Sequence, residues 1–485
     1  MRPLAPAAAA VLATLLAACE TARPSRFVAE SAPPRPSSAW TPPAAAERPP
    51  APAAQPEGIP AELLSGPRTI SLTEAVDVAL ATSPVTRRSW LQARSAAADV
   101  GSRESAFWPQ VDVGVGLSRQ QLSSQGGAVQ YLSTTWGPSA ALSWTLLDFG
   151  GRAADVEEKR QALFAAGFLH NQAVSDVVLA VQTSYYLYQG AKALVVAAES
   201  SLKQAEENLA AAEERRRAGV ATVADVLQSR TSLSQRRLEL ETARGLVETT
   251  RGALATSLGV PANVPVDVTA LPDGLRLEGA TPTVEQLIAE AEKRRPDLAA
   301  ARSRANGARA KVASLRSSGL PSLVGAGALA RSYYESPETA SPFGDAWSLG
   351  VAVRWPVFNG FRTAYDRKKA EEDAAAADAA TDVLGQQAIY QVWSGYAAVK
   401  TAAERIRAAK DLLASAAESE QVTLGRYKAG VGGILDLLAA ESSLASARAT
   451  DVQARASFLV ALAQLAHDTG ALDLAPVPQL KKDTP

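Results

Sequence analysis

The chain has few of the residues from which disulfides and metal centres are built. Of its 485 residues, one is cysteine, two are histidine and one is methionine. A single cysteine excludes an internal disulfide framework and a cysteine-ligated zinc site. The two histidines, His170 and His467, lie far apart in the sequence, so we expect no metal site.

An excess of one charge is also lacking. The 49 basic and 50 acidic residues give a formal net charge of −1. Proteins that bind nucleic acid normally carry a basic excess, so the composition argues against a nucleic-acid partner.

Catalytic motifs are lacking as well. The sequence has no Walker-type Gly-Lys-Ser/Thr and no His-Glu-x-x-His motif. Its acidic residues stand in runs with basic ones, such as 213–217, which are typical of solvated helix faces. We therefore expect that the protein is not an enzyme and uses no cofactor.

Alanine, in contrast, is abundant. It makes up 100 of the 485 residues, well above the usual share of any one residue type. Because alanine has the highest helix propensity and the smallest apolar side chain, the composition predicts a mainly α-helical protein whose long helices pack closely.

The N-terminus has the pattern of an export signal. Residues 1–18 combine Arg2 with an apolar stretch too short to span a membrane. The sequence Leu16-Ala17-Ala18-Cys19 resembles a bacterial lipoprotein signal, which implies S-diacylglycerol and N-acyl groups on Cys19 after cleavage. An ordinary secretory signal is the alternative. Residues 19–68 are rich in proline and alanine, which predicts a lipidated, extended linker that only spaces the lipid from the body.

The body is a tandem duplication at an offset of 211 residues. Residues 69–260 form the first repeat and 283–470 the second, with 261–282 as a connector and 471–485 as a tail. The matched pairs are Glu74/Glu285, Trp144/Trp355, Gly219/Gly430 and Asp225/Asp436, with Pro84/Pro296 after a one-residue slip. So many matches in one order indicate two copies of one structural unit.

Each unit predicts a long helix, over 152–217 and 361–428. Apolar and small residues recur at alternating spacings of three and four between Val174 and Ala212, and between Val392 and Ala416. A sustained pattern of this kind is typical of a coiled-coil seam. About 66 residues of helix extend for about 100 Å, deeper than an ordinary domain core. An amphipathic helix on a globular core is the alternative.

Two strands precede each long helix, at about 110–120 and 137–147, and at about 322–332 and 347–357. Each has about 11 residues, the length of a tilted strand that crosses a bilayer. Five tryptophans lie in or beside them, as expected of an interfacial aromatic girdle: Trp108, Trp136, Trp144, Trp347 and Trp355. Four strands cannot close a barrel in lipid, whereas three chains would supply twelve. A soluble sheet packed on helices is the alternative.

The most specific segments are Arg216–Gly219 followed by Asp225–Leu227, and Arg426–Gly430 followed by Leu435–Ala440. Together with the lipoprotein signal, the duplication and the heptad helices, they resemble the TolC-like outer membrane factors, in particular the lipoprotein branch related to OprM and NodT. The resemblance covers roughly residues 69–470.

The resemblance implies a homotrimer with a TolC-like fold. A twelve-stranded outer-membrane β-barrel would continue into an α-helical barrel that crosses the periplasm, with an equatorial belt around it. The protein would be the outer membrane channel of a tripartite efflux system in a Gram-negative bacterium. It would be a passive conduit for small molecules delivered by an inner-membrane pump and a periplasmic adaptor protein.

The resemblance also implies a gate at the helical tips. Asp436 would form the constriction, Asp225 and Tyr427 would form polar links, and Gly219 and Gly430 would form the turns. A helix N-capping role is the alternative for Asp225 and Asp436. The chain departs from the best-known tip pattern at Gly432, Gly433 and Ala439, so no double acidic ring is expected.

Two other functions fit the same patterns. The protein could be a membrane-anchored coiled-coil structural or interaction lipoprotein, with its strands in a soluble domain. It could also be the outer-membrane duct of a type I protein secretion system.

Overall fold

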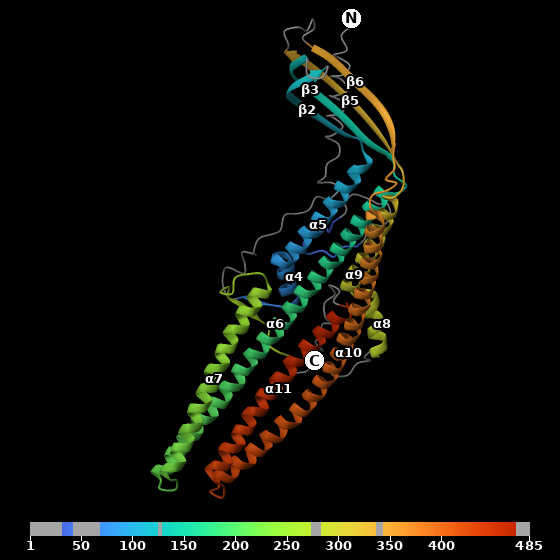
Figure 1. The fold of residues 1–485 in the computed structure, drawn as a ribbon. Coiled ribbons are helices and arrows are strands. Elements are labelled where there is room, and N and C mark those ends of the chain that lie inside the picture. The colour runs from blue at the N-terminus through green and yellow to red at the C-terminus, as the bar shows by residue number, and fades with distance from the viewer. Residues whose placement is uncertain (1–31, 42–67, 125–128, 273–282, 336–342, 472–485) are drawn as a thin grey trace.

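The structure is a computed structural model that describes residues 32–41, 68–124, 129–272, 283–335 and 343–471. The molecule is elongated. A β-sheet forms one end, and two helical hairpins form the other (Figure 1). The prediction of a mainly α-helical fold with a separate β part is confirmed.

Two units of the same element order make up the body. The first consists of α4 (Leu72–Thr82), α5 (Pro84–Glu104), the 3-10 helix η1 (Ser105–Phe107), β2 (Gln110–Ser124), β3 (Val129–Leu147), α6 (Gly151–Arg217) and α7 (Val223–Ser257). The second consists of α8 (Val284–Arg294), α9 (Pro296–Ser317), β5 (Ser322–Glu335), β6 (Phe343–Arg354), α10 (Arg362–Lys428) and α11 (Ile434–Asp468). The long helices have 67 residues in both units, and the returning helices have 35.

A capping box begins the first helix of each unit. In α4, the Ser71 hydroxyl accepts a hydrogen bond from the Glu74 N–H, and the Glu74 carboxylate accepts one from the Ser71 N–H. Thr283 and Gln286 make the same pair of bonds in α8. The equivalent of Glu74 is therefore Gln286, and the match with Glu285 was wrong. The one-residue slip between the two units therefore already applies at this helix. Glutamine replaces glutamate there because its side-chain oxygen accepts the same hydrogen bond.

The second helix of each unit begins with a proline. Pro84 and Pro296 occupy the first turn of α5 and α9, where the missing N–H leaves no helical hydrogen bond unmade.

The long helices carry the predicted coiled-coil seams. Every seam position on α6 and α10 is buried or half-buried, and Val181, Val392 and Ile406 are fully buried. α6 packs on α5 and α7, and α10 packs on α9 and α11 (Figure 1). Among the described residues, α6 is the one helix with a stretch apolar enough to cross a membrane by length and composition. Its contacts with α5, α7, α9 and α11 identify it as the central packing helix.

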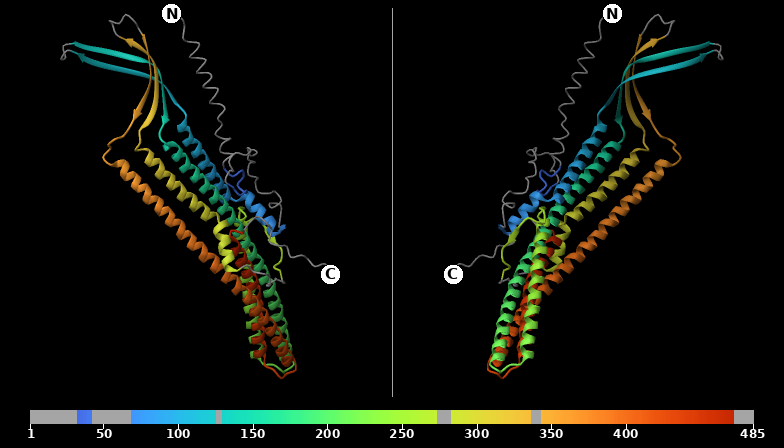
Figure 2. Two further views of the ribbon diagram at one scale, coloured as in Figure 1. Left: turned by 90° about the vertical axis from the view of Figure 1, so that its right-hand side faces the viewer. Right: turned by 90° about the vertical axis from the view of Figure 1, so that its left-hand side faces the viewer.

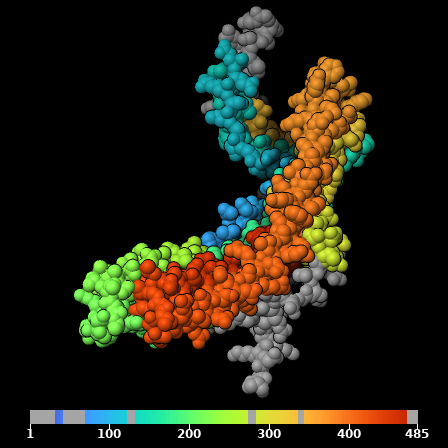
Figure 3. All heavy atoms as spheres, turned by 90° about the horizontal axis from the view of Figure 1, so that it is seen from below, coloured from blue at the N-terminus to red at the C-terminus, as the bar shows by residue number. Residues whose placement is uncertain are grey.

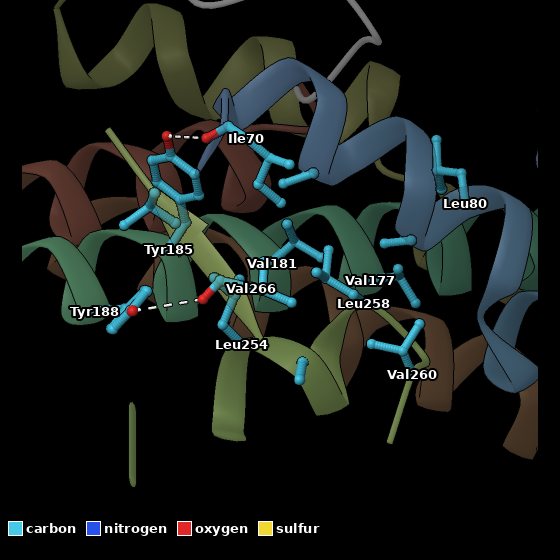
Figure 4. Packing of buried hydrophobic residues seen from close by; sticks show 14 of the residues in the cluster. Ile70, Leu80, Val177, Val181, Tyr185, Tyr188, Leu254, Leu258, Val260 and Val266 are labelled. Carbon is cyan, nitrogen blue, oxygen red and sulfur yellow. Dashed lines mark hydrogen bonds between the residues drawn. The ribbon is translucent and has the colours of Figure 1, made fainter. Parts of the chain in front are cut away.

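The largest apolar cluster lies at the level of α4, around two short parallel strands, β1 (Arg68–Ile70) and β4 (Val266–Val268). Figure 4 shows side chains of β1, α4, α6, α7 and β4 meeting there. The Tyr185 hydroxyl donates to the Ile70 carbonyl oxygen at 3.0 Å. This cluster joins the first unit to the described part of the connector, residues 261–272.

The four longer strands form one antiparallel sheet in the order β2-β3-β5-β6. Its two hairpins separate from each other toward their far ends (Figure 2). The predicted strands 110–120, 137–147 and 322–332 were too short at this far end. The alternation of apolar residues stops there, but the backbone ladder continues, with Gln120 opposite Ser133 and Ser124 opposite Val129.

The strand predicted over 347–357 is displaced. β6 starts earlier, at Phe343, and ends at Arg354. Pro356 has no N–H with which to continue the ladder, so Trp355 and Val357 lie beyond the strand.

A left-handed pair of residues joins each hairpin to its long helix. Phe149 and Gly150 have φ of 52° and 89°, and Gly360 and Phe361 have φ of 67° and 64°. The helix predicted from 361 therefore begins one residue later. At the first junction, the Asp148 carboxylate accepts a hydrogen bond from the Arg152 N–H at 2.7 Å and fixes the turn.

Residues 32–41 lie against α5 and α6, and we call this segment the strap. The Trp40 ring contacts Phe164 and Phe168, with centroids 5.6 and 5.4 Å away. The backbone of Trp40 exchanges two hydrogen bonds with the Asn171 side chain. Gly167 makes room for the ring, because a Cβ there would lie 2.3 Å from it. The expectation that the linker only spaces the lipid is therefore wrong for this segment.

The buried His170 holds the middle of the strap. Its Nε2 lies 3.0 Å from the Ser38 carbonyl oxygen, and its Nδ1 lies 2.9 Å from the Ser89 hydroxyl. Burial lowers the pKa of His170, so the imidazole is neutral at pH 7 and donates from Nε2 to Ser38.

Candidate functional site

The sheet has one apolar face and one polar face. The strand register places Leu117, Trp136, Tyr333 and Phe343 in one row on the apolar face, and Leu329 beside Trp347 in another. Val115, Leu117, Trp347 and Leu349 are each at least 75% exposed. The opposite face carries small and polar residues such as Ser139, Ala328 and Ser348. No described helix covers the apolar face (Figures 1 and 2), so it is suited to lipid and not to water.

Aromatic residues lie toward both ends of this face. Trp108, Trp144 and Trp355 lie where the sheet meets the helices, whereas Trp136 stacks on Tyr333 at 4.4 Å further along. Trp144 and Trp136 are eight residues apart, or about 27 Å along the strand. At the usual tilt of a membrane barrel, this corresponds to a height of about 20 Å, close to the apolar band of such barrels. Trp347 lies between the two levels, beside Leu329.

The other end of the molecule consists of two helical tips. We define tip one as the α6–α7 turn, residues 215–227, and tip two as the α10–α11 turn, residues 426–438. Seen from below, the two hairpins lie side by side (Figure 3). Gly219 and Gly430 end the long helices with φ of 76° in both tips. Val220 and Val431 each donate to the carbonyl oxygen five residues back, which is the Schellman arrangement.

Tip one is closed by a capping box. The Asp225 carboxylate accepts hydrogen bonds from the N–H and the hydroxyl of Thr222, at 2.7 and 2.9 Å. The Thr222 hydroxyl accepts one from the Asp225 N–H. The structure thus gives Asp225 the alternative capping role, in which its carboxylate is bonded within its own turn.

Tip two has a different set of side chains. α11 begins after Gly433 without a side-chain cap, and Asp436 is exposed, with no hydrogen bond or ion pair to another described residue. Tyr427 is buried with Ile434 and Leu437. Its hydroxyl is buried too, and no described residue lies within hydrogen-bonding distance of it.

Polar contacts join the two hairpins at the tips and above them. Arg215 of α6 stacks on the Tyr427 ring at 4.5 Å and donates to the Tyr427 carbonyl oxygen at 2.7 Å. Higher up, Gln204 donates to Glu420, and Asn208 donates to Glu441. A groove of about 530 Å³ runs between α6 and α10 beside these contacts.

Glu441 is the most perturbed carboxyl group in this region. Burial raises its pKa, the neighbouring Glu420 raises it further, and the Asn208 hydrogen bond and Arg236 lower it, giving a pKa of about 7. A substantial fraction of Glu441 is therefore protonated at neutral pH.

His467 links the end of α11 to α6. Its Nε2 lies 2.9 Å from Asp176, and its Nδ1 lies 3.1 Å from Asp468. Burial lowers the pKa of His467, but the two carboxylates outweigh this effect and raise it to about 9. The ring is therefore protonated at pH 7 and forms a structural ion pair. Within the described ranges, no group of three or more potential metal ligands gathers.

The structure brings Tyr427, Gly430 and Asp436 together in tip two, and Gly219 and Asp225 in tip one. Cys19 lies outside the described residues. The sequence interpretation missed the strap contacts and the Asn208–Glu441 contact. A signal for the strap was present, because Trp40 is the one tryptophan in the proline-rich stretch.

Comparisons with known proteins agree with this geometry. The sequence profile described as outer membrane efflux protein matches residues 75–260 and 287–471, once on each unit. The chain is similar to Protein CyaE of Bordetella pertussis, with 28% identity over 405 residues, which cover 81% of this chain and 84% of that protein. It is similar to the probable efflux pump outer membrane protein TtgC of Pseudomonas putida, with 26% identity over 357 residues, covering 70% and 71%. Its fold is similar to the crystal structure of a membrane protein from Pseudomonas aeruginosa, with a TM-score of 0.74, 24% identity and coverage of 82% and 93%.

Proposed function

Because the chain belongs to the outer membrane efflux protein family, whose members are transport conduits and not enzymes, we propose that three copies of it form one passive channel. The single chain is the outer membrane channel component of an efflux system in a Gram-negative bacterium. Its TolC-like fold extends from the outer membrane into the periplasm.

The observation that carries the trimer proposal is an open sheet with an exposed apolar face. The sheet order leaves one long side of β2 and one of β6 without a partner strand. Unpaired backbone groups are not tolerated in lipid, so the β6 edge of one copy has to pair with the β2 edge of the next. Twelve strands from three copies make a closed barrel of a known size.

The helices support the same closure. They pack in the order α5-α6-α9-α10, which is the order of the strands to which they connect, β2-β3-β5-β6. Closing the sheet therefore also brings α10 of one copy against α5 of the next and makes a helical tube below the barrel. A coiled-coil scaffold in water would leave the apolar face of the sheet uncovered, which argues against that alternative.

The partners follow from this role. An inner-membrane pump and a periplasmic adaptor protein would deliver small molecules to the helical end of the tube. The lipid on Cys19, with S-diacylglycerol and N-acyl groups, would anchor the chain to the outer membrane without spanning it.

The gate is proposed to lie at tip two. A threefold axis repeats the exposed Asp436 as a ring of three carboxylates. The hydroxyl of Tyr427 has no hydrogen-bond partner among the described residues, but it is buried within its own chain. A link from Tyr427 to another copy would therefore require its side chain to turn outward. Gly219 and Gly430 shape the turns. Asp225, which is bonded within its own turn, is the weaker candidate for a link between copies.

Reconstitution tests the channel. The purified protein should be a trimer in detergent by light scattering and should give discrete conductance steps in planar bilayers. A monomer without conductance would refute the proposal.

The gate has its own test. Asp436→Ala combined with Tyr427→Phe should raise the resting conductance several-fold if the exposed Asp436 carboxylates form the constriction and Tyr427 supports the turn that carries them. Asp225→Ala is the matched control and should leave the conductance unchanged. Tyr427→Phe removes no bond within one chain and so should not lower the stability of the monomer. Unchanged conductance in the double variant would place the constriction elsewhere.

A further inference from the structure

A hollow of about 520 Å³ lies between the end of α5, η1, β3 and the start of α6. Phe107, Trp108, Trp144, Ala153 and Val156 line it, together with the charged side chains Glu104 and Arg160. Val156 also belongs to the apolar cluster that contains Ala32, the first described residue of the strap. The N-terminal end of the strap and the hollow thus share one wall.

The walls of the hollow are held in place. The Trp144 indole N–H donates to the Phe107 carbonyl oxygen at 2.9 Å. The Arg152 guanidinium lies over the Phe107 ring at 5.0 Å and donates to the Ala106 carbonyl oxygen at 3.1 Å. A preformed hollow of this size, with mostly apolar walls and a few charged groups, is typical of sites that take an amphipathic ligand.

The position of the hollow indicates its ligand. Trp144 lies on the lipid-facing side of the sheet, at the end that meets the helices. Val156 is five residues after the start of α6, about 8 Å below the sheet. The hollow therefore opens at the expected level of the lipid headgroups, below the hydrocarbon into which the exposed valines and leucines of the sheet project.

The length of chain before the strap fits the same assignment. Ala32 is thirteen positions after Cys19 (32 − 19), a span of up to about 45 Å when extended. Ala32 belongs to the same apolar cluster as Val156, which lines the hollow, so this length of chain is enough for the lipid on Cys19 to reach it. Docking of the strap also keeps the effective concentration of the anchor at the hollow high.

We propose that this hollow binds the glyceryl end of the lipid on Cys19 of the same chain, while the acyl chains extend into the hydrocarbon above it, and that the strap delivers the lipid there. The inference rests on the proposed lipidation of Cys19 and not on the conductance of the channel. In this proposal the strap holds the lipid on Cys19 beside the β2–β3 hairpin of its own subunit.

Photo-crosslinking in intact cells tests the site. p-Benzoylphenylalanine placed at Ala153, which is exposed and lines the hollow, should capture the lipopeptide that begins at Cys19. The denatured product should keep the mass of one chain. The same probe at Leu320, at the same level on the α9–β5 connection, should capture only free phospholipid. Capture of free phospholipid alone at Ala153, capture of no lipid, or a dimer-sized product would overturn the proposal.

Release of the strap gives a second test. Gly167→Ala places a methyl group where the Trp40 ring lies, so capture at Ala153 should fall about tenfold as the anchor loses its local concentration. Gly245→Ala is the control, because a Cβ there meets open space, and capture should not change. Equal capture in both variants would overturn the role of the strap.

Mass spectrometry of the N-terminal peptide distinguishes a failure of the lipid site from a failure of the channel. An unmodified Cys19 would overturn the anchor and this site, and would leave the channel to be judged by its conductance.

Discussion

The two tips share a backbone turn but not the side chains that support it. Both long helices end in Ala-Gly-Val with the glycine at φ of 76°. Tip one is then closed by Thr222 and Asp225, whereas tip two begins α11 at Gly433 with no side-chain cap. Tip two depends instead on buried Tyr427 and on Arg215, which comes from the first unit. The difference shows that the duplication kept the geometry and left one tip self-supporting and the other dependent on its neighbour.

The largest effect is expected from Tyr427→Ala. It removes the ring from the cluster with Ile434 and Leu437 and should destabilise tip two by about 3 kcal/mol, as large-to-small changes in a packed site do. Hydrogen exchange of the α10–α11 turn measures the local opening. Arg216→Ala, at the equivalent exposed position of tip one, should change it little. Comparable loosening of both tips would contradict the proposed asymmetry.

Gly219→Ala and Gly430→Ala should have equal effects. A Cβ at either position meets open space, so the cost is the left-handed backbone alone, about 1–2 kcal/mol in each tip. Denaturant titration combined with hydrogen exchange of each turn gives the two values. If the two losses of stability differed by more than about 1 kcal/mol, the two turns would not have the same backbone conformation.

The caps should respond in opposite directions. Thr222→Ala removes the capping box of α7 and should cost about 1 kcal/mol in tip one. Gly433→Thr supplies α11 with a cap at a compatible φ of −81° and should gain a few tenths of a kcal/mol. Amide hydrogen-exchange rates in the first turns of α7 and α11 measure both changes in stability. A loss of stability in Gly433→Thr would show that this glycine is required for another reason.

A further effect concerns the pH dependence of stability at the contact between the hairpins. Because burial raises the pKa of Glu441 from 4.5 to about 7, its contribution to stability is fully present below pH 4.5 and is lost as the pH rises to about 7. Asn208, Arg236 and Glu420 face it from α6, α7 and α10. Glu441→Gln should remove this slope in the exchange of amides near Asn208, and Glu418→Gln, an exposed neighbour, should keep it. A slope that persists in Glu441→Gln would have another origin.

Features that follow one element were predictable from the sequence. The heptad seams follow from apolar spacing along a single helix, and Val392 and Ile406 are buried where that spacing places them. The two faces of β3 and β6 follow from strand alternation. Pro84 and Pro296 start their helices because local geometry favours proline there.

Features that depend on which elements meet were not predictable. Asn208 and Glu441 are polar residues on helices of different units, and their contact exists only because α6 packs on α11. Trp40 lies in a stretch predicted to be an extended linker, and its packing depends on the space that Gly167 leaves on α6. The far ends of the strands carry no apolar alternation, because backbone pairing alone sets their length.

The equal helix lengths of the two units limit how insertions and deletions can change the length of the helical part of the molecule. One residue inserted into α6 alone would displace its tip by about 1.5 Å and rotate it by about 100°, while the other tip stayed in place. The lengths of 67 and 35 residues occur in both units and therefore place the two tips at the same distance from the sheet. The helical end can change length with its two tips kept at the same height only if both units gain or lose the same number of residues. Equal lengths therefore keep the two tips level for any protein that binds to them.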